Sequence, residues 1–110
     1  MPAEADALSR LLGTRGLRYA LLTNPGGELL GSAGHVPDDT SFVKAAQAVA
    51  QSLVATVGGQ ELKDLMLDLA GGPVLLTPQE GNLLVVGFDD VGNLGRVRFA
   101  VRREIGKLKN

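Results

Sequence analysis

Hydrophobic residues along the chain come in short runs that clusters of glycine and proline separate. The runs have the length of β-strands. The peptide Asn24-Pro25-Gly26-Gly27 between the first two is typical of a hairpin turn, because glycine tolerates the positive φ that a tight turn needs. Similar clusters at 70–73 and 78–81 separate the later runs. The pattern predicts five strands, over residues 17–22, 28–32, 65–69, 74–77 and 82–88.

Three other segments have the apolar spacing of helices. The longest, residues 40–57, contains no glycine or proline, is opened by the capping candidates Asp38, Asp39 and Thr40, and is closed by Gly58-Gly59. A second helix is predicted over 93–108, with Asn93 as its cap and with apolar residues three or four positions apart. A shorter helix is expected over residues 3–12. The predicted order is α-β-β-α-β-β-β-α, in a single domain that spans residues 1–110.

Several of the predicted strands are apolar at consecutive positions, as in Ala20-Leu21-Leu22 and Val74-Leu75-Leu76. Strands of this kind need cover on both faces of their sheet. Because the turns are short, neighbouring strands are expected to be antiparallel. We therefore expect an α+β fold with a five-stranded antiparallel sheet, the central helix on one face and the two terminal helices on the other.

The central helix is expected to have two distinct faces. An apolar stripe that would dock on the sheet consists of Val43, Ala46, Ala50, Leu53, Val54 and Val57. Small residues recur on a second face, at Ala45, Ala48, Ser52 and Ala55, and a polar strip contains Lys44, Gln47 and Gln51. Small side chains let another helix approach closely, and a second copy of the chain could supply that helix. The alternative is that alanine, a good helix former, simply faces solvent here.

The predicted strand at 65–69 favours the dimer. It has a hairpin connection on one side only, so it is expected to lie at an edge of the sheet, and it carries the apolar residues Met66 and Leu67. An unpaired apolar edge is an aggregation hazard that pairing across a twofold axis would remove. We therefore expect a homodimer interface formed by Ala45, Ala48, Ser52, Ala55, Met66 and Leu67.

Composition narrows the class of protein. With 45% hydrophobic and 21% charged residues the chain is not intrinsically disordered, and the absence of cysteine excludes disulfides and thiol chemistry. The first residues are acidic, unlike a signal peptide, and no apolar stretch approaches the roughly 18 residues of a membrane span. We expect a cytoplasmic protein without membrane insertion.

The charge of the chain is unevenly distributed. Residues 1–90 contain five Lys or Arg against eleven Asp or Glu, whereas residues 91–110 contain six against one. The basic set is Arg96, Arg98, Arg102, Arg103, Lys107 and Lys109. Because the rest of the chain is acidic and only Phe99 lies among these residues to stack on bases, no nucleic acid partner is expected.

No arrangement of residues in the sequence predicts catalysis. His35, the single histidine, falls in a glycine- and proline-containing loop, and the adjacent Asp89 and Asp90 are better suited to starting a helix than to binding a metal. Neither a dinucleotide-binding fingerprint nor a phosphate-binding loop occurs. We expect no catalytic residue, no metal and no cofactor.

Three parts of the sequence together resemble the Roadblock family. They are the hairpin Tyr19-Ala20-Leu21-Leu22-Thr23-Asn24-Pro25-Gly26-Gly27, the alanine-rich central helix, and Gly87-Phe88-Asp89-Asp90 followed by Asn93-Leu94-Gly95-Arg96-Val97-Arg98. This family includes the Roadblock light chains of dynein, and the compact chain is most similar to its bacterial MglB-type branch. The resemblance covers residues 5–108. The short first helix, interrupted by Gly13 and Gly16, departs from the family pattern.

The resemblance implies dimerisation through the central helix and third strand, with the paired surface serving as a platform for a small Ras-like GTPase. It also implies stimulation of GTP hydrolysis by remodelling of the GTPase's own site, without an arginine finger. Lys44, Gln47 and Gln51 would be the polar contacts to the partner. The leading hypothesis is a non-enzymatic GTPase regulator. The alternative is a scaffold module that binds a protein or small ligand without a nucleotide-dependent role.

Overall fold

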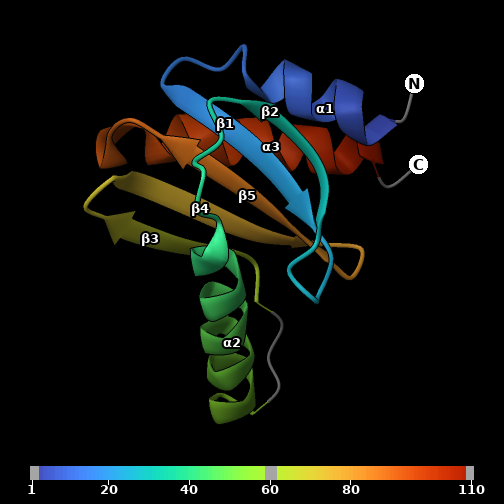
Figure 1. Cartoon of the computed structure of the whole chain (residues 1–110), viewed down its shortest axis with the longest axis vertical. Helices are drawn as coiled ribbons and strands as arrows, with labels where there is room; N and C mark the ends of the chain where they lie inside the picture. The colour runs from blue at the N-terminus through green and yellow to red at the C-terminus, as the bar shows by residue number, and fades with distance from the viewer. Residues whose placement is uncertain (1–2, 59–61, 109–110) are drawn as a thin grey trace.

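The computed structural model describes residues 3–58 and 62–108. Figure 1 shows a five-stranded sheet with α1 and α3 side by side along one face and α2 projecting from the other side. The helices are α1 (Ala3–Leu11), α2 (Ser41–Thr56) and α3 (Leu94–Leu108), and the strands are β1 (Leu17–Thr23), β2 (Leu29–Gly34), β3 (Leu65–Leu69), β4 (Gly72–Gln79) and β5 (Asn82–Phe88). The predicted order and the α+β class are confirmed.

The strand order in the sheet is β2-β1-β5-β4-β3, and every neighbouring pair is antiparallel. The strands β1, β4 and β5, which have continuous apolar runs, lie inside the sheet, as their need for cover on both faces predicted. The turn between β4 and β5 is shorter than expected, because Glu80 (φ 51°) and Gly81 (φ 82°) both adopt the left-handed conformation of a two-residue hairpin. β4 therefore extends to Gln79, further toward this turn than the glycine and proline pattern indicated, whereas β5 has its predicted bounds.

Side chains of the inner strands alternate between two separate cores. Ala20, Leu22 and Val86 face α1 and α3, where Leu8, Leu11, Val97 and Val101 cover them. Tyr19, Leu21 and Val85 face the α2 side. This is the period-2 alternation of a strand, with apolar residues pointing both ways.

The start of α3 differs from the expectation. A short 3-10 turn, Val91–Asn93, precedes the helix, and Asp90 caps this turn by accepting a hydrogen bond from the Gly92 backbone N–H at 3.0 Å. Asn93 was wrongly expected to be the cap. Its amide group instead donates to Asp89 Oδ1 at 2.8 Å and accepts from Arg96 Nη1 at 3.1 Å.

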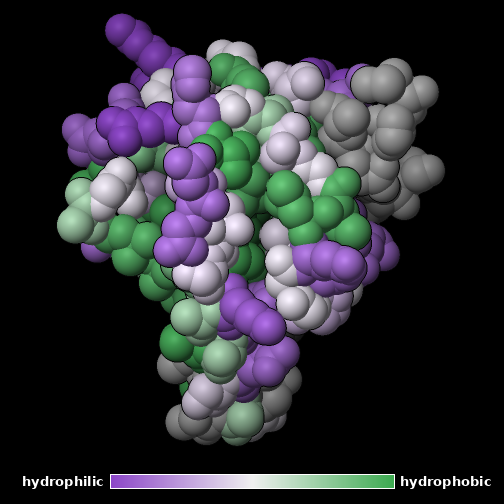
Figure 2. All heavy atoms as spheres, viewed as in Figure 1, coloured by the Kyte–Doolittle hydropathy of each residue, from purple (hydrophilic) through white to green (hydrophobic). Residues whose placement is uncertain are grey.

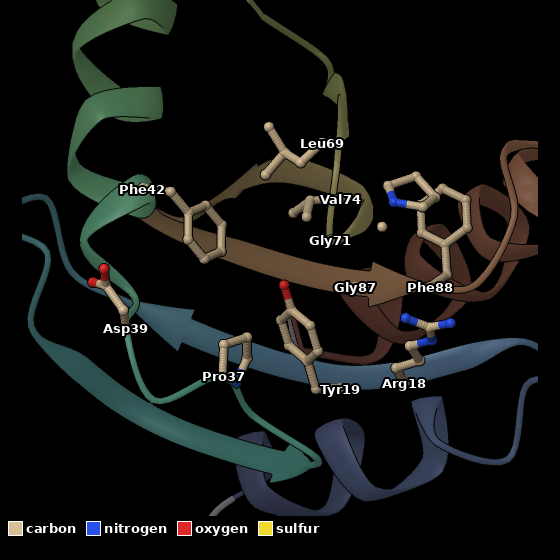
Figure 3. Close-up of a pocket in the computed structure, with 12 residues that line it drawn as sticks. Arg18, Tyr19, Pro37, Asp39, Phe42, Leu69, Gly71, Val74, Gly87 and Phe88 are labelled. Carbon is tan, nitrogen blue, oxygen red and sulfur yellow. The ribbon is translucent and has the colours of Figure 1, made fainter.

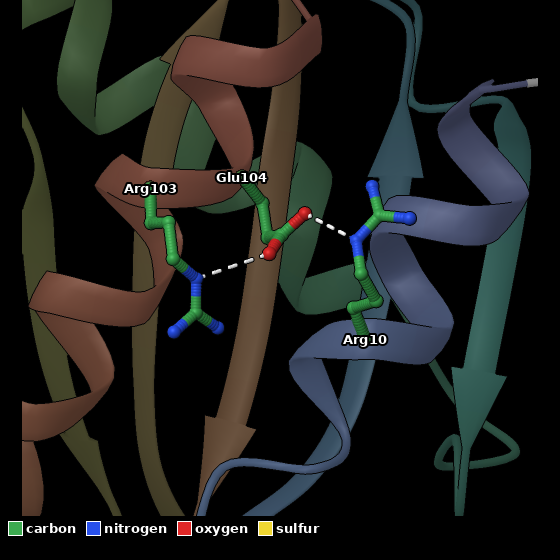
Figure 4. A network of polar contacts seen from close by, with 3 residues as sticks. All are labelled: Arg10, Arg103 and Glu104. Carbon is green, nitrogen blue, oxygen red and sulfur yellow. Dashed lines mark hydrogen bonds and ion pairs between the residues drawn. The ribbon is translucent and has the colours of Figure 1, made fainter.

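Two carboxylates connect α3 to its neighbours. Glu104, with 1% of its side chain exposed, accepts from Arg10 Nε of α1 at 2.8 Å and from Arg103 Nε at 3.1 Å (Figure 4). Asp64, just before β3, accepts from Arg98 Nε and Nη2 at 2.8 and 3.1 Å. These pairs fix α3 to α1 on one side and to the start of β3 on the other.

Candidate functional site

The first turns of α2 form the attachment of this helix to the sheet. Val43 and Ala46 are buried in the α2-side core, and Phe42 packs against it. The backbone N–H of Ser41 donates to Asp39 Oδ1 at 3.0 Å, which caps the start of the helix. The side chain of Ser41 and, to a smaller extent, its backbone form hydrogen bonds with the Asp39 carboxylate, and these lower the pKa of Asp39 below its usual value. Of the three capping candidates before the helix, Asp39 takes this role.

The rest of α2 stands away from the sheet (Figure 1). The expectation that the whole apolar stripe docks on the sheet was wrong: Ala50 is half-buried and Val57 is 50% exposed. The side chains of Leu53 and Val54 lie outside the described residues. The physical reason is the direction of the helix, which carries its later turns beyond the strands that bury Val43 and Ala46.

The small-residue face of α2 lies on the surface. Its residues Ala45, Ala48, Ser52 and Ala55 are all exposed, and Val49 on the same helix is 51% exposed. Figure 2 shows α2 as the lower protrusion, with pale and green atoms beside a purple strip. Exposed apolar residues that adjoin one another on a helix surface are typical of a binding surface.

The other part of the predicted interface is β3, which pairs only with β4 and so lies at an edge of the sheet, as expected. Met66 packs against the core on the α1 and α3 side, whereas Leu67 packs against the core on the α2 side. Both side chains are half-buried, and Leu69 is 39% exposed. The edge thus combines unpaired backbone with partly exposed apolar side chains. We refer to the exposed surface of α2 and the edge of β3 together as the α2–β3 surface.

The three residues of the predicted polar strip have different surroundings in the structure. Gln47 Nε2 donates to the backbone oxygen of Asn24 at 3.1 Å, so this side chain ties α2 to the first hairpin turn. The aliphatic part of Lys44 lies beside Gly27 in the same turn, where a Cβ on that glycine would meet Lys44 Cγ at 3.5 Å. Gln51 is exposed. The hairpin turn and the polar strip therefore form one continuous surface.

A hollow that sequence reasoning missed lies beside the start of α2 (Figure 3). It has a volume of about 200 Å³ and is lined by Arg18, Tyr19, Phe42, Leu69 and Gly87, among others. The ring of Tyr19 lies directly over Gly87, where a side chain would collide with it. Burial raises the pKa of the Tyr19 hydroxyl. Gly87 within the apolar run of β5 was the available signal, because an isolated glycine in a strand often marks a close approach.

The structure places the residues considered for catalysis or metal binding in a surface segment and in a turn. His35 is exposed just after β2, and Asp89 and Asp90 hold the 3-10 turn. In the part of the chain that the structure describes, no group of three His, Cys, Asp or Glu side chains is placed to hold a metal ion. No helix within these same residues is long and apolar enough to cross a membrane.

Comparison with known proteins identifies the fold. Residues 4–88 match the Roadblock/LC7 domain. The chain is similar to the gliding protein MglB of Thermus thermophilus, with 23% identity, a TM-score of 0.79, and coverage of 96% of this chain and 85% of that one. It is also similar to MglB of Myxococcus xanthus, with 22% identity, a TM-score of 0.80, and coverage of 94% and 89%.

A Roadblock/LC7 domain from Streptomyces avermitilis has 18% identity and a TM-score of 0.71, with coverage of 96% of this chain and 98% of that chain. No curated protein sequence matches the chain. At these identities the solved structures establish a shared fold.

Proposed function

Because the chain belongs to the Roadblock/LC7 family, we propose that it is a cytoplasmic, homodimeric regulator that binds a small Ras-like GTPase and stimulates hydrolysis of its GTP. The observation that carries the proposal is the α2–β3 surface, which joins an apolar helix face to an unpaired strand edge. The chain's own residues bind and orient the partner, while the reacting groups belong to the GTPase.

The α2–β3 surface supports dimerisation through its composition. Ala45, Ala48 and Ala55 expose only methyl groups, so a second helix can approach closely along them. Val49 and Val57, each about half exposed, supply apolar area that this approach would remove from water. Pairing of β3 with the partner's β3 would satisfy the free backbone groups of both edges and extend the two sheets into one.

The paired surface would act as a platform for the GTPase. Lys44 and Gln51 are exposed on α2, whereas Gln47 is held by the hairpin turn. We therefore assign direct polar contacts to Lys44 and Gln51 and a positioning role to Gln47. Lys44 is the one cation in the sequence of α2, which carries no arginine, so stimulation through this helix would act by positioning groups of the GTPase itself.

The test begins with partner capture on the immobilised chain, in parallel with GDP and with a non-hydrolysable GTP analogue. A GTPase identified in this way is then assayed for single-turnover GTP hydrolysis with and without the chain. We expect faster hydrolysis with the unaltered chain and a smaller effect with Lys44→Ala and Gln51→Ala together.

Ser9→Ala is the matched control, because Ser9 is exposed on α1, across the sheet. A captured partner whose hydrolysis and nucleotide exchange do not change would support the scaffold alternative instead.

A further inference from the structure

The outward face of α3 combines an exposed aromatic ring with arginines. This α3 face consists of Gly95, Arg96, Phe99, Arg102, Arg103 and Gly106, all exposed. Phe99 has 69% of its surface exposed, and the two glycines leave the ends of the face without side chains that would shield the ring. The ring is therefore the central apolar group of a cationic helix surface.

The acidic partners of these arginines lie beneath the face. Glu104 is 1% exposed and contacts Arg103 from below, and Asp64 is 13% exposed and lies 3.6 Å from Arg102 Nη2. The side chain of Arg102 itself is 61% exposed. The carboxylates orient the guanidinium groups while the cations remain in contact with solvent, so the surface presents positive charge.

A hollow continues the α3 face toward the start of β3. Its volume is about 390 Å³, and Lys63, Arg102, Ile105 and Thr77 contribute to its lining. Lys63 and Arg102 place two cations at this hollow, and charge-assisted hydrogen bonds from them can hold a phosphate group.

We propose that the α3 face docks on an anionic phospholipid bilayer, with Phe99 entering the headgroup boundary and a lipid phosphate in the hollow beside Lys63 and Arg102. Basic side chains near a membrane surface are attracted to anionic headgroups, and an exposed aromatic ring beside them adds apolar contact at the headgroup level. Arginine stems lie along the apolar boundary while their heads reach the phosphates. The helix rests on the surface and does not span the bilayer.

A nucleic acid fits this face less well. Single-stranded nucleic acid is usually held by several stacked aromatic residues, and Phe99 is the one aromatic residue on this face.

The test is sedimentation of the full chain with vesicles of phosphatidylcholine alone or with about 30 mol% phosphatidylglycerol, a fraction that gives a strongly negative surface. We expect binding to the anionic vesicles only, weakened by salt. Phe99→Ala should weaken it about tenfold and Arg96→Ala about fivefold. Lys63→Ala should weaken it several-fold, because it removes one of the two cations at the hollow.

The matched controls are Arg18→Ala, which removes a cation at the hollow beside α2, and Leu30→Ala, which removes an exposed apolar residue of β2. Both should bind anionic vesicles like the unaltered chain. Equal binding to neutral vesicles, equal binding by Phe99→Ala and Arg96→Ala, or binding of duplex DNA in place of vesicles would each overturn the proposal.

Discussion

On one side of the sheet α1 and α3 lie flat and bury Leu8, Leu11, Val97 and Val101 almost completely, whereas on the other side α2 buries Val43 and Ala46 and then leaves the sheet. Both sides are built from apolar strands. The difference shows that the chain itself buries the apolar side chains between the sheet and the two helices α1 and α3. On the α2 side, exposed small residues and an unpaired strand remain for another molecule.

The substitution with the largest expected effect disrupts the α2–β3 surface. Ala48→Glu would place an unpaired carboxylate between two closely packed helices, which costs several kcal/mol when the charge is buried. We expect this variant to be a monomer in light scattering, whereas Ala48→Ser, which keeps the residue small, should remain a dimer. A dimer of Ala48→Glu with unaltered affinity would exclude Ala48 from the interface.

A second prediction concerns the close contact between Tyr19 and Gly87 on the α2 side. Gly87→Ala would drive a methyl group into the Tyr19 ring and should lower the free energy of unfolding by about 1 to 3 kcal/mol. Chemical denaturation measures this change. Gly71→Ala is the matched control, because a Cβ at Gly71 meets nothing within 4 Å. Equal stabilities of the two variants would contradict the contact.

A third prediction tests the connection between α1 and α3. Arg10→Ala removes one hydrogen-bonded partner of the buried Glu104 carboxylate, while Arg103 remains. Because Glu104 is buried but keeps Arg103, and Arg10 is itself 45% exposed, we expect a loss of about 1 kcal/mol, at the lower end of the cost of removing a partner from a buried polar group. Chemical denaturation should show this loss with the oligomeric state unchanged. A monomeric Arg10→Ala variant would contradict this prediction, because it would show that the contact between α1 and α3 affects the α2–β3 surface on the other side of the sheet.

The smallest expected effect is the pH dependence contributed by Asp39 at the start of α2. Since hydrogen bonding with Ser41 lowers the pKa of Asp39 in the folded chain, its contribution is present above the ordinary carboxyl pKa and is lost as pH falls through the folded pKa. Asp39→Asn removes this titration. Melting temperatures of the two proteins should converge as the solution is acidified, and a constant difference would contradict the assignment.

Sequence patterns predicted the elements and the edge position of β3 because these depend on local turn chemistry and on hairpin connectivity. The direction of α2 was not predictable in this way, because the spacing of Val43, Ala46, Ala50 and Val57 is the same whether the stripe packs on its own sheet or on a second chain. The role of Gln47 also escaped, since its hydrogen bond to Asn24 joins residues 23 positions apart. Periodicity identifies a buried face without identifying what covers it.

The measurement that tests the central claim most directly is the mass of the unaltered chain in dilute solution by light scattering. The account predicts twice the chain mass of 11.5 kDa, because the α2–β3 surface is completed by a second copy. A mass of one chain at micromolar concentration would contradict it and would leave that surface to a different partner.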